Sequence, residues 1–183
     1  MCGIAGIVDF EGRPLDPQAL VAARAMLRHR GPDDCGKWTA AGGGLSVALT
    51  ATRLAILDPS PGGHQPMTRD DSRFAIVFNG LIYNYRELGA ELAREGITLA
   101  TSCDTEVVLA ACAVWGRGAL ERFNGMFALA FFDRATGSGF LARDRFGIRP
   151  LLWVEHGNRL TDLIKQSNAS SNESSAVSSD TPS

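Results

Sequence analysis

Short apolar runs alternate with polar and glycine-rich stretches along the chain, and their period predicts strands near both ends. Residues 2–8 combine glycine with branched apolar side chains, which is typical of a buried strand. Similar runs predict further strands at 45–52, 73–78, 126–132, 140–143 and 151–154. Asn79-Gly80 follows the third of these strands directly, and this dipeptide predicts a turn that ends it.

Helix start and stop signals occur between these strands. Asp16 followed by Pro17 is typical of an N-cap and a first helical residue. Asn84 predicts a helix start whose stop signal is Gly96, and a further helix is expected from Asp104 to about residue 116. Strands and helices therefore segregate along the chain instead of alternating, and this order predicts an α+β fold.

Composition adds bounds on size, location and partners. The chain has 183 residues, of which 45% are hydrophobic, and its formal net charge is −2. This length suits one domain, and the weak charge indicates neither nucleic acid nor anionic membrane as a partner. No apolar run is long enough to span a bilayer, and the N-terminus lacks the basic start of a signal peptide. We therefore expect a cytoplasmic protein.

The composition changes near the C-terminus. Eight of the last 17 residues are serine, and Val177 is the only large aliphatic side chain among them. Such a segment buries too little apolar surface to offset the entropy of ordering it. We predict a folded domain over residues 2–160 and a disordered, serine-rich tail over residues 161–183.

Cys2 is the first candidate for chemistry. A residue this small after the initiator permits removal of Met1, which would leave Cys2 with a free α-amine. An α-amine has a pKa of about 7.7–8.0, so a terminal thiol carries its own general base. Taken alone, the alternative that position 2 merely tolerates a small residue is the stronger interpretation. Cys103 and Cys112 are expected to be small buried hydrophobes, because no cysteine spacing indicates a metal or redox pair.

Eight segments, in order, strengthen the interpretation of Cys2. They are Met1-Cys2-Gly3-Ile4-Ala5-Gly6, His29-Arg30-Gly31-Pro32-Asp33, Arg53-Leu54-Ala55-Ile56-Leu57-Asp58, Gly63-His64-Gln65-Pro66-Met67, Phe78-Asn79-Gly80, Ser102-Cys103-Asp104-Thr105-Glu106, the segment 122–128 and the segment 142–150. Together they resemble the glutaminase domain of class II glutamine amidotransferases, in the asparagine synthetase branch. The resemblance covers roughly residues 2–154.

The resemblance implies a fold and a reaction. Members of this family are N-terminal nucleophile hydrolases with a four-layer αββα sandwich. Cys2 would attack the side-chain amide of glutamine, form a thioester with loss of ammonia, and be released by water as glutamate forms. Asn79 and Gly80 match the oxyanion hole, through the asparagine amide and the glycine N–H.

The same resemblance implies a substrate pocket. Arg53 matches the residue that binds the α-carboxylate, and the stretch Leu54, Ala55, Ile56 and Leu57 would line the pocket. Asp104 matches the acid that binds the α-ammonium group, although it is also a plausible helix N-cap. Leu81 stands where this branch commonly carries a second acid, so glutamine binding is expected to be weaker or altered in specificity.

Other motif residues are expected to support the site. Arg30 and Asp33 look like scaffold, because a buried charge needs a partner. His29 and His64 are not expected to transfer protons, since the family uses no histidine for that step.

The sequence also departs from the family after Pro150. The pyrophosphate-binding loop of the synthetase domain, Ser-Gly-Gly-x-Asp-Ser, is absent from these 183 residues. We therefore expect no cofactor in this chain, with ATP and Mg²⁺ required only by a synthetase domain. The expected partners are L-glutamine and either a separate synthetase subunit or a second copy of the chain. A silent glutamine-binding module and a non-functional remnant stay open as alternatives, and the ammonia acceptor is undetermined.

Overall fold

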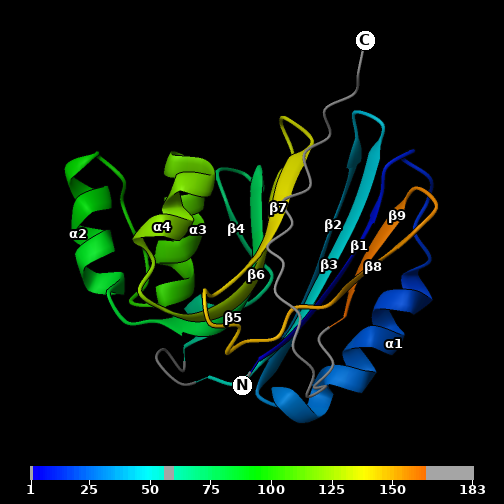
Figure 1. The fold of residues 1–183 in the computed structure, drawn as a ribbon, viewed down its shortest axis with the longest axis horizontal. Coiled ribbons are helices and arrows are strands. Elements are labelled where there is room, and N and C mark those ends of the chain that lie inside the picture. Colours follow the sequence, from blue (N-terminus) through cyan, green and yellow to red (C-terminus); the bar gives the residue numbers. More distant parts are fainter. Residues whose placement is uncertain (1, 56–59, 164–183) are drawn as a thin grey trace.

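Two antiparallel sheets pack face to face, with helices on the outer face of each (Figure 1). The computed structural model describes residues 2–55 and 60–163. The first sheet has the order β2-β3-β1-β9-β8 and is built from Asp34–Gly42, Leu45–Arg53, Gly3–Asp9, Arg159–Leu163 and Trp153–His156. The second has the order β4-β5-β6-β7 and is built from Met67–Arg69, Phe74–Ile82, Gly125–Asp133 and Ser138–Arg143.

The helices complete the outer layers. The first sheet is covered by α1 (Pro17–Leu27), and the second by α2 (Tyr85–Arg94), α3 (Asp104–Trp115) and the short α4 (Ala119–Arg122) (Figure 1). Asp16 caps α1 as predicted, because its side chain accepts a hydrogen bond from the backbone N–H of Gln18 at 2.9 Å. The predicted α+β class and αββα layering are confirmed.

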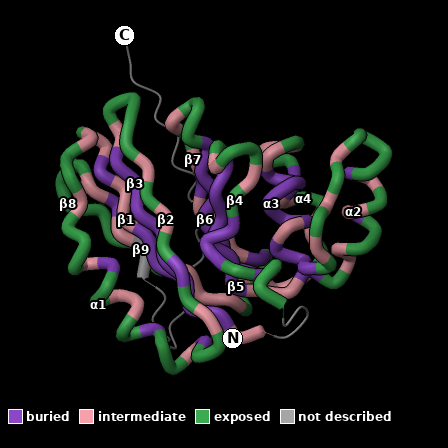
Figure 2. The backbone as a smooth tube through the Cα atoms, turned by 180° about the vertical axis from the view of Figure 1, so that it is seen from behind, coloured by how far each residue is buried: buried purple, intermediate pink, exposed green. Residues whose placement is uncertain are grey.

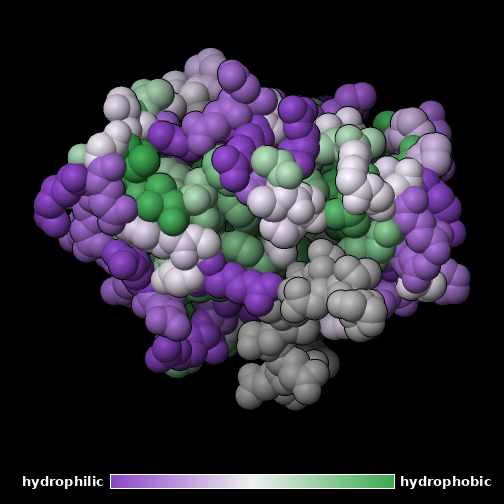
Figure 3. Space-filling model, turned by 90° about the horizontal axis from the view of Figure 1, so that it is seen from above, coloured by the Kyte–Doolittle hydropathy of each residue, from purple (hydrophilic) through white to green (hydrophobic). Residues whose placement is uncertain are grey.

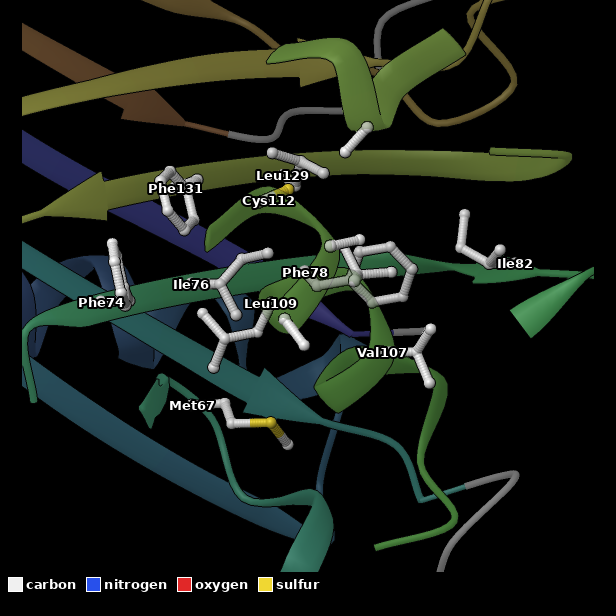
Figure 4. Packing of buried hydrophobic residues seen from close by; sticks show 14 of the residues in the cluster. Met67, Phe74, Ile76, Phe78, Ile82, Val107, Leu109, Cys112, Leu129 and Phe131 are labelled. Atoms are coloured by element: carbon white, nitrogen blue, oxygen red, sulfur yellow. The ribbon is translucent and has the colours of Figure 1, made fainter. Parts of the chain in front are cut away.

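Alternating side chains on the second sheet face two different cores. On β5, Ala75 and Val77 face the first sheet, whereas Ile76 and Phe78 face the helices. Figure 4 shows the helix-facing core, in which Leu109 of α3 lies over Ile76 and Phe78. Buried backbone accordingly runs along the centres of both sheets (Figure 2).

The Asn79-Gly80 turn prediction is wrong. Strand β5 continues through both residues, with Asn79 opposite Ala128 and Gly80 opposite Phe127 of β6. Gly80 is needed there because β6 approaches very closely: a Cβ at this position would lie 2.3 Å from the carbonyl oxygen of Met126. The dipeptide therefore serves close packing between strands and not a change of chain direction.

Strands β2, β4, β8 and β9 differ from expectation. The edge strands β2 and β4 were not predicted, because β2 is largely exposed and β4 has only three residues, so neither shows a clear apolar period. At the C-terminal end, the single strand expected at 151–154 is instead a hairpin of β8 and β9. Strand β9 pairs with β1 and extends past the boundary predicted at residue 160. The rest of the predicted tail, 164–183, lies outside the described residues.

The two ends of the sandwich differ: one has an apolar groove, and the other holds the N-terminus (Figure 1). At one end, an apolar groove opens between the sheets and is lined by residues such as Val8, Leu45 and Leu141. Seen from above, apolar surface is visible in the middle of the molecule between polar edges (Figure 3). The N-terminus lies at the opposite end (Figure 1). Within the described ranges, no helix is long and apolar enough to cross a membrane.

Candidate active site

A pocket at the N-terminal end of β1 gathers residues that are far apart in the sequence. Of the residues predicted for the site, seven line it: Cys2, Arg53, Leu54, Asn79, Gly80, Leu81 and Asp104. Ala55 is not among the lining residues, and Ile56 and Leu57 lie outside the described residues. Six lining residues were not predicted to belong to the site: Gln65, Phe78, Cys103, Thr105, Met126 and Arg149.

Cys2 lies partly buried just before β1. Its Sγ is 3.9 Å from the carbonyl oxygen of Leu54, and its own carbonyl oxygen accepts a hydrogen bond from Nε of Arg30 at 3.3 Å. Arg30 thus holds the backbone at the N-terminus. The Asp33 carboxylate accepts the backbone N–H of Ala55 at 2.9 Å, so this side chain holds the chain just after Arg53.

Arg53 is the last residue of β3, and its side chain is buried. Its Nη1 donates to the carbonyl oxygen of Ser60 at 2.9 Å. Gly63 lies directly against the guanidinium group, since a Cβ at this position would lie 1.9 Å from Nη2. The Pro61–Gly63 turn therefore forms a wall that holds the Arg53 side chain in place.

Asn79 supplies a hydrogen-bond donor that is not satisfied within the described chain. The residue is 1% exposed, and its buried Nδ2 has no hydrogen-bond partner among the described residues. A buried donor left unsatisfied costs about 1–3 kcal/mol. Because Asn79 lines the same pocket as Cys2, a ligand acceptor bound there would satisfy this donor.

Asp104 is a buried carboxylate at the start of α3. The helix N-cap is Cys103 and not Asp104, so the alternative prediction of a capping role is wrong. One carboxylate oxygen of Asp104 accepts the backbone N–H of Ile82 at 3.2 Å. Burial raises the pKa of this carboxyl, and the hydrogen bond from Ile82 acts in the opposite direction.

Two further polar residues shape the pocket. Gln65 is buried, and its Oε1 accepts the backbone N–H of Phe78 at 2.7 Å, which ties the loop before β4 to β5. Cys103 is buried as predicted, and this desolvation raises the pKa of its thiol. Gln65 and Cys103 both fall in the motif segments, but no local pattern indicates that they reach the pocket.

The histidines and possible metal ligands lie elsewhere. His64 places Nδ1 2.7 Å from a carboxylate oxygen of Asp34, and neither it nor His29 is among the residues that line the pocket. In the described part of the chain, no group of three or more His, Cys, Asp or Glu side chains is arranged to hold a metal ion.

Comparison with known sequences identifies close relatives. A putative glutamine-hydrolysing asparagine synthetase of Mycobacterium tuberculosis is 40% identical over 163 residues, which cover 82% of this chain and 25% of the relative. A second putative asparagine synthetase, from Methanocaldococcus jannaschii, is 38% identical and covers 86% of this chain and 33% of the relative. The chain thus spans about a quarter to a third of the length of these relatives.

Solved structures support the fold. The glutamine phosphoribosylpyrophosphate amidotransferase of Bacillus subtilis superimposes with a TM-score of 0.69 at 20% identity, over 88% of this chain and 41% of that one. Its similarity therefore concerns the fold alone.

The sequence pattern of the glutamine amidotransferase domain matches residues 1–177. This match covers nearly the whole chain and includes every residue that lines the Cys2 pocket. The chain therefore belongs to the glutamine amidotransferase domain family.

Proposed function

We propose that this chain hydrolyses L-glutamine to L-glutamate and ammonia, with Cys2 as the nucleophile. The observation that carries the proposal is the buried Nδ2 of Asn79, which has no hydrogen-bond partner among the described residues. Asn79 lines one pocket together with Cys2. A carbonyl oxygen that becomes negatively charged beside the thiol would satisfy this donor and be stabilised by it.

The charged residues of the pocket suit a free α-amino acid. The guanidinium group of Arg53 binds the α-carboxylate, and the carboxylate of Asp104 binds the α-ammonium group. Leu54, which lines the pocket, contacts the aliphatic part of the substrate. Leu81 adds an apolar wall where a second acid would otherwise assist Asp104.

The reaction proceeds in two steps once Met1 has been removed. The α-amine of Cys2 accepts the thiol proton, Sγ attacks the amide carbon, and the resulting oxyanion is held by Nδ2 of Asn79 and the N–H of Gly80. The tetrahedral intermediate collapses to a thioester, and the proton leaves with ammonia. Water then attacks the thioester, releasing glutamate and restoring the thiol.

Substitution of the nucleophile tests the proposal directly. Purified chain with Met1 removed, as verified by mass spectrometry, should release ammonia from L-glutamine. Cys2→Ala should abolish this release. The other thiol of the pocket, Cys103, has no terminal α-amine to accept its proton, and burial raises its pKa. Cys35→Ala, at an exposed position of β2, should not alter the release. Ammonia release that survives in Cys2→Ala contradicts the mechanism.

Removal of the oxyanion donor gives a second, quantitative test. Asn79→Ala should lower kcat by about 10²–10³-fold with a small change in KM, because this donor acts mainly on the transition state. The measurement is steady-state ammonia release, with circular dichroism to verify folding. An unchanged kcat would remove Asn79 from the oxyanion hole.

A silent glutamine-binding module is the second candidate, and Leu81 is the observation that favours it. With leucine at this position, Asp104 is the one acid among the described residues that line the pocket. Calorimetry with L-glutamine separates the two functions. A silent module takes up glutamine without releasing ammonia, whereas the proposed enzyme shows continuous heat from turnover.

The acceptor of the ammonia is proposed from the relatives. They are named asparagine synthetases, and this chain corresponds to about a quarter to a third of their length. We therefore propose that the ammonia is used by an ATP-dependent synthetase, on polypeptide that these 183 residues do not include. ATP and Mg²⁺ belong to that second step and are not required for glutamine hydrolysis.

A further inference from the structure

Gln65 lines the pocket but has no part in the reaction described above. It is 3% exposed, and its side chain reaches β5, where Oε1 accepts the backbone N–H of Phe78 at 2.7 Å. The pairing of β4 with β5 ends at Met67, which lies opposite Ile76. The same register, continued by two residues, places Gln65 opposite Phe78. A side-chain oxygen therefore holds this edge of β5 just beyond the point where β4 ends.

A second side chain holds the same edge of β5 four residues further on. One carboxylate oxygen of Asp104 accepts the backbone N–H of Ile82 at 3.2 Å, and this contact is buried. In an antiparallel sheet, the N–H groups of every second residue point to the same side of the strand. The N–H groups of Phe78, Gly80 and Ile82 therefore point to one edge of β5, and side chains accept the first and the third of them.

The strand on the other side of β5 gives the same direction for the Gly80 N–H. Gly80 lies opposite Phe127 of β6. The N–H of Phe127 donates to the carboxylate of Asp144 at 3.1 Å, and its carbonyl oxygen accepts the Asp144 N–H at 2.8 Å. Because both backbone groups of Phe127 are engaged there, its pair with Gly80 is a non-hydrogen-bonded one. The Gly80 N–H accordingly points away from β6.

The Gly80 N–H thus lies between two fixed positions of a strand edge. Among the described residues, no strand pairs with β5 beyond Ile76 on this side. Gly80, Gln65 and Asp104 all line the pocket that contains Cys2. A backbone donor stabilises an oxyanion only when it is aimed at it within hydrogen-bond geometry. On an edge without a partner strand, that aim depends on the side chains that hold the neighbouring N–H groups.

We propose that Gln65 is a positioning residue of the oxyanion hole, which holds the N–H of Phe78 and thereby aims the N–H of Gly80 at the reacting carbonyl group. Asp104 holds the other side of Gly80 through Ile82, in addition to its role toward the α-ammonium group. This inference rests on the proposed function, because it takes the Gly80 N–H as a donor to the oxyanion. It predicts that loss of the Gln65 acceptor lowers kcat without weakening the binding of glutamine.

The test is Gln65→Met, which removes the acceptor and keeps a side chain of similar length. It should lower kcat for ammonia release from L-glutamine by about 10- to 100-fold and change KM less than about threefold, since the donor acts on the transition state. In the Cys2→Ala background, calorimetry should give a Kd for L-glutamine that Gln65→Met changes less than about threefold. Hydrogen exchange measured by NMR should become faster at the Phe78 N–H and stay slow at the Ile82 N–H.

Thr50→Val is the matched control for a loss of stability. The Oγ1 of Thr50 donates to the carbonyl oxygen of Gly36 at 2.7 Å, so this variant removes a buried side-chain-to-backbone bond of the same length from the first sheet. Neither residue lines the Cys2 pocket. Thr50→Val should lower the melting temperature and leave kcat unchanged.

Two further variants at the same position keep the test decisive. Gln65→Glu retains an acceptor oxygen for the Phe78 N–H and should recover most of the kcat that Gln65→Met loses. Gln65→Asn takes the place of Gln65→Met if that variant does not fold. Its side chain is one methylene shorter and does not reach Phe78, so the same loss of kcat is expected.

The outcomes separate this inference from the proposed function. If the original chain with Met1 removed releases no ammonia, the proposed function fails. If it releases ammonia and Gln65→Met keeps its kcat, or loses activity only through a higher KM, the positioning role is overturned and glutamine hydrolysis stands. The role is also overturned if Thr50→Val or Gln65→Glu loses as much kcat as Gln65→Met.

Discussion

Asn79 and Asp104 carry buried polar groups in the candidate site, and the two groups differ in their hydrogen bonding to the rest of the chain. The Asn79 amide nitrogen has no acceptor in the described chain, whereas one Asp104 oxygen is already engaged by the backbone of β5 at Ile82. Burial of such groups is costly, so their persistence together around one thiol indicates function more than stability.

Asp104 should make glutamine binding depend on pH. Burial raises the pKa of this carboxyl, so its protonated form persists above the ordinary aspartate pKa of about 3.9. The α-ammonium group needs the ionised form. KM for glutamine should therefore rise as the pH falls through the raised pKa, and it should be lower at neutral pH. Steady-state kinetics between about pH 4.5 and 7.5 measure this change.

The matched variant for this prediction is Asp104→Asn, which has no charge to titrate. Its KM should be high throughout this range and should lack the acidic rise. If Asp104→Asn keeps the acidic rise of the original chain, another group is responsible.

At the scale of elements, Asp9 links β1 to its neighbour β9 in the first sheet. It ends β1, and one of its carboxylate oxygens accepts Nε of Arg159 in β9 at 2.5 Å and Nε of Arg13 at 3.0 Å. The other oxygen accepts the backbone N–H groups of Glu11 and Arg13. Burial favours the protonated form, but these bonds outweigh it and hold the pKa of Asp9 well below its usual range.

This lowered pKa predicts a pH-dependent contribution to stability. A carboxyl whose folded pKa is depressed contributes its full stabilisation above its unfolded pKa. The contribution is lost progressively as the pH falls from the unfolded pKa through the folded pKa. Asp9→Asn should therefore lower the free energy of unfolding most at pH 7, and the difference from the original chain should shrink below about pH 4. Urea unfolding at several pH values measures it.

Asp16→Asn is the control for the Asp9 variant, because asparagine caps a helix about as well as aspartate. It should change stability little at either pH. A deficit in Asp9→Asn that is the same at pH 7 and at pH 3 would contradict the role of the Asp9 charge.

At the scale of the whole molecule, the hairpin of β8 and β9 completes the first sheet beside β1, the strand that follows Cys2. Strand β9 pairs with β1 from Ala5 to Asp9, and β8 forms the outer edge. Three of the large exposed apolar side chains, Leu152, Trp153 and Val154, lie in or next to β8. The strand that leads away from Cys2 is thus stabilised by residues near the other end of the described chain.

Truncation separates the hairpin from the serine-rich segment. A chain ending at residue 163 should melt at the same temperature as the full chain, because the composition of the remaining residues predicts no packed structure. A chain ending at residue 150 should melt lower and aggregate, since the edge of β1 is left unpaired. Circular dichroism melts and light scattering measure both. Equal melting of all three chains would contradict a structural role for the hairpin.

Local patterns in the sequence were sufficient to predict part of the secondary structure and part of the candidate site. Apolar alternation and capping residues predicted the central strands and the helices α1, α2 and α3, because these signals depend on neighbours within one element. The four-residue helix α4 was not predicted. The motifs that resemble the amidotransferase family also selected Cys2, Arg53, Asn79, Gly80 and Asp104, and the family assignment is confirmed. The roles of these residues stay predictions that the proposed variants test.

Tertiary structure alone decided the rest. It placed Asn79 and Gly80 within β5 and not in a turn, because the approach of β6 depends on a strand more than 40 residues away in the sequence. It brought Gln65 into the pocket, where its side-chain oxygen accepts the backbone N–H of Phe78, and Arg149, whose backbone N–H donates to the Asp144 carboxylate. It also paired β9 with β1. The strand pairings β5 with β6 and β9 with β1 join residues distant in the chain, so no local period indicates them. A thiol at position 2, in contrast, is evident from the sequence itself.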